Sequence, residues 1–190
     1  MASSCCSTWR SNVSAVNVLV VFYSRYGETE RLALAAGLGA IQAEGNIRLR
    51  RVADLAPRER IDADAGWSQS LTRMNRDYVA PRPADPPWAD VIILAAPPDQ
   101  AAEVETFVQT LSSLGPMQNK LAAPLAAATD APCLAALFVA ASRAGLISVP
   151  VAGQTAAGEA DRLTRARLHG QRLVHMARAL KNAPAEPGQG

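Results

Sequence analysis

Runs of apolar residues alternate along the chain with segments in which apolar residues recur at helical spacing. Residues 18–23 (VLVVFY) and 91–95 (VIILA) are continuous apolar runs, typical of strands buried on both faces. Residues 47–52 alternate apolar residues with arginine, which indicates an edge strand with one solvated face. Small and apolar residues at 121–128 and 146–151 predict a fourth and a fifth strand.

Helices are predicted between these strands, at residues 28–44, 101–114, 131–144 and 159–180. The proline-rich stretch 53–87 shows little periodicity, and we expect a long excursion with one short helix near 68–76. Strands joined by crossover helices pair in parallel, with right-handed connections. The pattern therefore predicts a three-layer α/β fold: a five-stranded parallel sheet of order 2-1-3-4-5 with helices on both faces.

The two ends of the chain differ from its middle. We expect a disordered extension at 1–16, a single domain at 17–181 and a flexible tail at 182–190. The composition, 49 % apolar and 19 % charged with a net charge of +2, gives no reason to expect nucleic acid or a membrane as a partner. Because no apolar run resembles a signal-peptide core or a membrane span, we expect a cytoplasmic protein.

Cysteine and histidine offer little chemistry in this chain. Cys5, Cys6 and Cys133 suggest neither a disulfide framework nor a metal set, and we interpret Cys133 as a small buried residue rather than a reactive thiol. His169 and His175 are six residues apart, on different faces of the predicted last helix, so we expect no metal site at this pair.

The most informative segment is the loop at residues 24–29 (SRYGET), which follows the first strand and opens a helix. Free backbone N–H groups at such a place can surround a phosphate, and glycine permits close approach of the backbone. Hydroxyl groups and an arginine add further donors, and an outward-facing glutamate suits the helix dipole. The alternative is an ordinary strand-to-helix turn capped by Ser and Thr. The candidate contacts are Ser24, Arg25, Tyr26, Gly27, Glu28 and Thr29.

Residues 18–40, VLVVFYSRYGETERLALAAGLGA, resemble the opening of the flavodoxin-like NAD(P)H:quinone oxidoreductases of the tryptophan-repressor-binding-protein (WrbA) family. Weaker likenesses occur at 89–94 (ADVIIL) and 167–172 (RLHGQR). The resemblance implies a flavodoxin-like fold, FMN with its phosphate in the 24–29 loop, NAD(P)H as electron donor and a quinone or similar acceptor. We also expect a homo-oligomer. Loops after the third and fourth strands hold the flavin ring in that family, which adds Pro97, Pro98, Asp99, Thr129 and Asp130 to the candidate contacts.

These two loops depart from the family pattern. Residues 96–102 (APPDQAA) stand in place of a polar, glycine-containing loop, and residues 129–134 (TDAPCL) contain neither the glycine nor the histidine of the family. Two functions therefore stay open. One is an FMN-dependent oxidoreductase, in which the flavin supplies the chemistry and no catalytic side chain is required. The other is a degenerate flavodoxin-like subunit that has lost the flavin and acts through protein contacts.

Two further functions of related folds are excluded by the residues present. A phospho-acceptor receiver domain needs an acidic pair after the first strand, where this chain has Ser24 and Arg25, and an aspartate at the end of the third, where it has Ala95 and Ala96. A dinucleotide-binding Rossmann protein needs Gly-x-Gly-x-x-Gly after the first strand, and only Gly27 occurs there.

Overall fold

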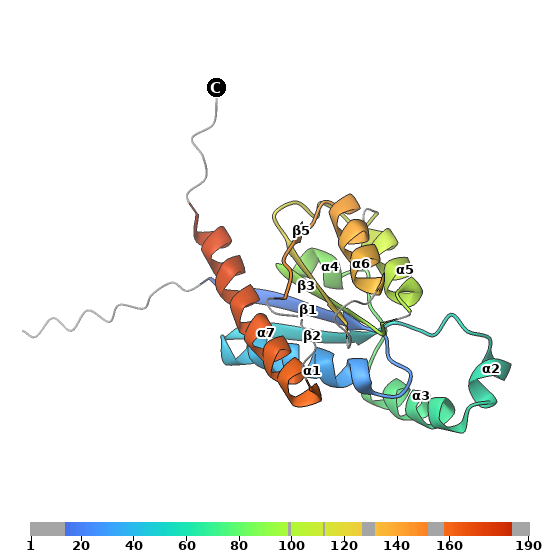
Figure 1. Cartoon of the computed structure of the whole chain (residues 1–190). Coiled ribbons are helices and arrows are strands. Elements are labelled where there is room, and N and C mark those ends of the chain that lie inside the picture. Colours follow the sequence, from blue (N-terminus) through green and yellow to red (C-terminus); the bar gives the residue numbers. More distant parts are fainter. Residues whose placement is uncertain (1–13, 99, 112, 127–131, 152–157, 184–190) are drawn as a thin grey trace, which may run out of the picture.

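The computed structural model describes residues 14–98, 100–111, 113–126, 132–151 and 158–183 (Figure 1). The predictions for the first thirteen residues, for the chain beyond residue 183, and for Asp99, Thr129 and Asp130 fall outside this part of the chain.

Five parallel strands form one sheet of order β2-β1-β3-β4-β5, which confirms the predicted topology. The continuous apolar pattern of β1 follows from its place inside the sheet: Val18 and Val20 pack on one face, and Leu19 and Val21 on the other. The strands are β1 (Val16–Phe22), β2 (Gly45–Arg51), β3 (Val91–Ala96), β4 (Leu121–Ala126) and β5 (Ile147–Ser148).

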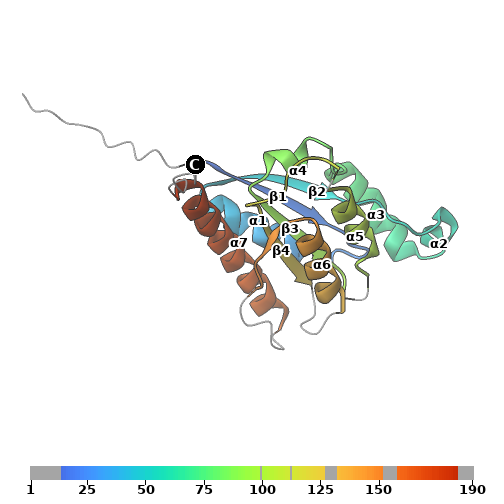
Figure 2. The same cartoon turned by 90° about the horizontal axis from the view of Figure 1, so that it is seen from above.

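The helices of the described residues are α1 (Glu28–Gln42), α2 (Arg58–Asp62), α3 (Ala65–Asp77), α4 (Asp85–Trp88), α5 (Ala102–Leu111), α6 (Pro132–Arg143) and α7 (Glu159–Asn182). Figure 2 shows α1 and α7 on one side of the sheet and α5 and α6 on the other. Each pair covers its own apolar cluster, and this arrangement produces the three layers. In the part of the chain that the structure describes, no helix has the length and apolar character needed to cross a membrane.

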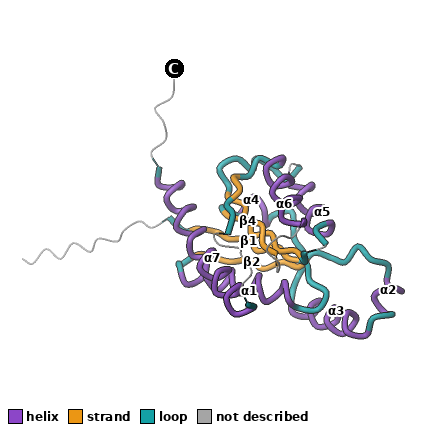
Figure 3. The backbone as a smooth tube through the Cα atoms, viewed as in Figure 1, coloured by secondary structure: helices purple, strands orange, loops and turns teal. Residues whose placement is uncertain are grey.

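The 53–87 stretch contains more structure than its sequence predicts. Three helices form there instead of one, and Figure 3 shows a long loop that leads from the sheet to α2. The predicted helix exists as α3, which starts where the side chain of Asp64 accepts a hydrogen bond from the Trp67 N–H (2.9 Å). The other two, α2 and α4, are too short to display a helical period, so pattern alone missed them.

The last strand is shorter than predicted: β5 covers two residues rather than the whole of 146–151. The N–H of Val149 still donates to the Ala122 carbonyl at 2.8 Å. This bond, with that from the Ile147 N–H to the Lys120 carbonyl (2.9 Å), is all that joins the described residues of this segment to β4 through its N–H groups.

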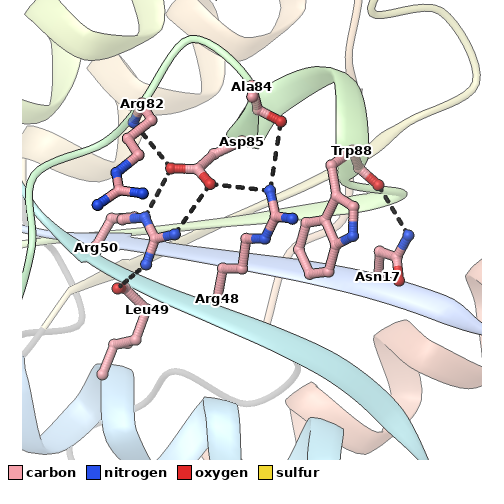
Figure 4. Close-up of polar contacts among 8 residues, drawn as sticks. All are labelled: Asn17, Arg48, Leu49, Arg50, Arg82, Ala84, Asp85 and Trp88. Atoms are coloured by element: carbon pink, nitrogen blue, oxygen red, sulfur yellow. Dashed lines mark hydrogen bonds and ion pairs between the residues drawn. The ribbon is translucent and has the colours of Figure 1, made fainter.

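The edge position of β2 is confirmed, but its arginine face is less solvated than predicted. Figure 4 shows Arg48 and Arg50 bound to Asp85 at the start of α4. The Asp85 carboxylate is buried and accepts from Arg48 Nη1 (3.1 Å), from Arg50 Nε (2.7 Å) and from the backbone N–H of Arg82 (2.8 Å). The Arg48 guanidinium also lies 4.0 Å from the ring centre of Trp88. The edge strand is therefore covered on this face by a segment some 35 residues away in sequence.

His169 of α7 is buried, and burial together with the charge of Arg172 lowers the pKa of its imidazole to about 4, although a backbone hydrogen bond with Val149 opposes the shift. In the unfolded chain the same group titrates near 6.5. The unfolded chain therefore binds more protons between these two pH values. We expect the free energy of unfolding to fall as the pH drops through this window, by up to about 3 kcal/mol from this residue.

Urea unfolding across this pH range tests the expectation. The variant His169→Gln should lose part of the wild-type decline, because it lacks the titrating group. The variant His175→Gln, at an exposed position of the same helix, is the matched control and should keep the wild-type decline. Equal declines in wild type and His169→Gln would contradict the assignment.

Candidate functional site

The 24–29 loop leaves the sheet at the carboxyl end of β1 and leads directly into α1. Gly27 is the N-cap of α1 and has φ 101°, in the left-handed region that glycine adopts without strain. Its N–H donates to Ser24 Oγ at 3.0 Å, which closes the turn. No described side chain caps α1 at Gly27. The first N–H groups of this helix, at the positive end of its dipole, are thus placed to receive an anion.

The side chains of the loop divide between buried and exposed positions. Ser24 and Thr29 are buried, and Glu28 is exposed, as an anion site at this turn requires. Tyr26 is 58 % exposed. Arg25 lies with its guanidinium 4.3 Å from the ring centre of Trp67. In this structure, therefore, Arg25 is held against α3 rather than over the turn.

Asp54 is the centre of a buried polar cluster beside the loop that the sequence did not reveal. Its carboxylate accepts from Tyr23 Oη (3.0 Å), Trp67 Nε1 (2.9 Å) and Arg51 Nη2 (2.6 Å). Burial raises the pKa of Tyr23, although its hydrogen bond from Arg25 opposes the shift, so the phenol stays protonated and donates to Asp54. The cluster joins the ends of β1 and β2 to α3. An aspartate shortly after the second strand was the available signal for it.

Glu30, in the first turn of α1, is a second buried carboxylate that the sequence analysis missed. Both of its oxygens pair with the guanidinium of Arg73, with Nη1 to Oε1 at 2.7 Å and Nη2 to Oε2 as the second contact. Tyr78 Oη donates to Oε1 at 2.6 Å. The hydrogen bonds from Arg73 hold the pKa of Glu30 below its ordinary value despite burial, so the carboxylate is charged and neutralised by its partner.

The loop after β3 lies beside the 24–29 loop. The sheet register pairs Phe22 with Ala95, and the Tyr23 N–H donates to the Ala95 carbonyl at 3.0 Å, so the two loops leave the sheet next to each other. Pro97 and Pro98 follow within a short turn. A hollow of about 580 Å³ lies between the starts of α5 and α6, lined by Pro98, Gln100, Ala101, Ala102, Glu103, Glu105, Pro132, Cys133 and Ala136. Cys133 is buried, as predicted.

No protein-family model matches the chain. A curated NAD(P)H dehydrogenase (quinone) from Deinococcus radiodurans is 30 % identical over 111 residues, a match that covers 55 % of this chain and 55 % of that protein. The chain therefore spans about half the length of this relative.

Solved structures show the same architecture. A flavodoxin from the domain Archaea superposes with a TM-score of 0.57 at 13 % identity, over 85 % of this chain and 99 % of its own. An NAD(P)H:quinone oxidoreductase from Methanothermobacter marburgensis gives 0.50 at 14 % identity, over 84 % of this chain and all (100 %) of its own.

The strand order and these likenesses define an α/β protein of the flavodoxin-like fold. The curated relative shows a likeness to a quinone dehydrogenase over about half of this chain, and it does not single out the tryptophan-repressor-binding proteins.

Proposed function

We propose that this protein is an FMN-dependent oxidoreductase that passes electrons from NAD(P)H to a quinone or similar small acceptor, with the FMN phosphate in the 24–29 loop. The supporting observation is the start of α1, where a left-handed glycine opens a helix that no described side chain caps, at the carboxyl end of a central strand. The name of the Deinococcus radiodurans relative points to the same reaction class.

The residues of the loop fit a phosphate. A Cβ at position 27 would make only ordinary contacts, 3.4 Å from Glu30 Oε2 and 3.7 Å from Arg73 Nη2, so glycine is needed here for the left-handed backbone that shapes the turn. The nearby negative charge of Glu30 is neutralised by Arg73, and Glu28 faces solvent. The loop therefore presents N–H donors without an opposing unpaired buried charge.

In this proposal the chain binds and orients, and bound FMN supplies two-electron transfer from the nicotinamide to the acceptor. The N–H groups at the start of α1 and the hydroxyls of Ser24 and Thr29 hold the phosphate. Arg25, Tyr26 and Glu28 complete the loop. Residues of the two neighbouring loops, Pro97, Pro98, Asp99, Thr129 and Asp130, stay proposed ring contacts. The homo-oligomer expected from the sequence also stays a prediction.

We expect FMN to stabilise the purified protein against thermal unfolding, by about 2.7 kcal/mol at a hundredfold excess over its dissociation constant. Titration should quench FMN fluorescence, and riboflavin, which lacks the phosphate, should bind more weakly. A protein that remains colourless, leaves FMN fluorescence unchanged and gains no thermal stability would contradict the proposal. It would favour the degenerate subunit instead.

A further inference from the structure

α3 stands outside the three layers, beside the turn that joins β1 to α1 (Figure 1). On its apolar face, Trp67 and Leu71 pack with Ile61 in a small separate cluster, whereas Met74 is buried in the main core that covers one face of the sheet. Three polar ties nevertheless connect α3 and its flanking residues to the 24–29 loop and the first turn of α1. These ties join segments that are far apart in sequence.

The strongest tie holds Glu30. Both of its carboxylate oxygens pair with Arg73, and one of them also accepts from Tyr78 Oη. These contacts fix the third residue of α1 to the end of α3. The Tyr78 ring in turn stands edge-on against Phe22, the last residue of β1, with ring centres 5.0 Å apart and an interplanar angle of 85°. The first turn of α1 is therefore positioned relative to both the strand and α3.

The other two ties hold the loop itself. Tyr26 Oη donates to Asp64 Oδ2 at 2.6 Å, and the other oxygen of Asp64 caps α3. Arg25 stacks on Trp67, whose Nε1 is bound to Asp54. Three positions of seven in the segment 24–30 thus contact α3 or its N-cap.

We propose that α3 is a clamp that sets the geometry of the 24–29 loop, with Arg73 and Tyr78, acting through Glu30, as positioning residues for phosphate recognition. This inference rests on the proposed function. A turn that is already ordered loses less conformational entropy when it binds an anion than a mobile one does. Arg73 has a second effect, because it neutralises the carboxylate nearest to the turn.

The variant Arg73→Gln tests the clamp, with Arg76→Gln as the matched control on the same helix. Arg76 is exposed and its ion pair is with the neighbouring Asp77. In Arg73→Gln we expect the dissociation constant for FMN to rise about tenfold, while that for riboflavin, which lacks the phosphate, changes less than about twofold. Arg76→Gln should change neither. Equal weakening of FMN and riboflavin, or no weakening of FMN, would overturn the inference.

The variant Glu30→Ala distinguishes a positioning role of Glu30 from an effect of its negative charge alone. Removing a carboxylate near a phosphate strengthens FMN binding if charge alone matters, whereas the clamp predicts weaker binding, in the same direction as Arg73→Gln. Tighter FMN binding in Glu30→Ala would overturn the clamp. If Arg73→Gln does not fold, Tyr78→Phe replaces it, because this change keeps the ring on Phe22 and removes only the bond to Glu30.

Amide hydrogen exchange of the ligand-free protein gives a readout that needs no flavin. The clamp predicts faster exchange at residues 25–30 in Arg73→Gln and unchanged exchange in Arg76→Gln. If the wild-type protein binds no FMN, the proposed function is contradicted. In that case the exchange rates alone decide whether α3 orders the loop. Unchanged exchange in Arg73→Gln contradicts the clamp, whatever the flavin result.

Discussion

Replacing Gly27 by valine is expected to abolish FMN binding while the protein still folds. The backbone at Gly27 has φ 101°, a conformation that a β-branched residue adopts only at a cost of about 1–3 kcal/mol. Space near the Cβ is not the obstacle, since the nearest atom, Glu30 Oε2, lies 3.4 Å away. Relief of the backbone strain turns the N–H groups of the loop away from a common centre. We expect the dissociation constant for FMN to rise by about a hundredfold or more.

The variant Gly145→Val is the matched control, because Gly145 has φ 83° after α6 and a Cβ there would meet nothing closer than 3.9 Å. It should lose a similar free energy of unfolding, measured in urea, and bind FMN as the wild type does. Unchanged FMN affinity in Gly27→Val would show that the phosphate does not lie in the 24–29 loop.

The substitution Gly170→Ala is expected to cause a large loss of stability. Helices α1 and α7 meet backbone to backbone: a Cβ at Gly170 would lie 2.0 Å from the carbonyl oxygen of Ala36, and one at Gly39 would lie 1.8 Å from that of Arg167. Because the obstructing atoms belong to the main chain, no rotamer change relieves the clash, and the helices have to separate. We expect the free energy of unfolding to fall by about 3 kcal/mol.

The variant Gly37→Ala provides the control for this prediction. Gly37 is also buried in α1, but a Cβ there would lie 3.6 Å from Ile47 Cδ1, an ordinary contact. The higher helix propensity of alanine should then raise the stability by up to about 1 kcal/mol. Urea unfolding followed by circular dichroism measures both variants. A loss of less than about 0.5 kcal/mol in Gly170→Ala would contradict the close helix contact.

Local sequence pattern reveals the features that burial and backbone freedom impose on neighbouring residues. The central strands were predicted because burial on both faces leaves a continuous apolar run, as in β1 and β3. The start of α1 was predicted because Gly27 lies between a strand and a helix, where glycine commonly forms a tight turn. The early end of β5 was missed because apolar residues continue past Ser148.

The side-chain contacts around the candidate site join residues that are far apart in sequence. Glu30 meets Arg73 across 43 residues, and Asp54 meets Tyr23 across 31. Nothing in the local sequence marks Glu30 as buried, because a glutamate in the first turn of a helix is ordinarily exposed and suited to the dipole. The position of Asp54 after the second strand was visible, but its three partners were not. The arginines of β2 show the same effect, since their alternation predicted solvent and Asp85 occupies that face instead.

The sequence by itself determined the buried strands and the turn at Gly27, because these depend on burial periodicity and on the backbone freedom of one glycine. The strand order followed from the rules for crossover connections. Only the tertiary structure decided how that loop is held. The 53–87 stretch has too little periodicity to predict its course, yet it folds so that α3 contacts Arg25, Tyr26 and Glu30. Such contacts arise from the packing of distant segments, which no local pattern encodes.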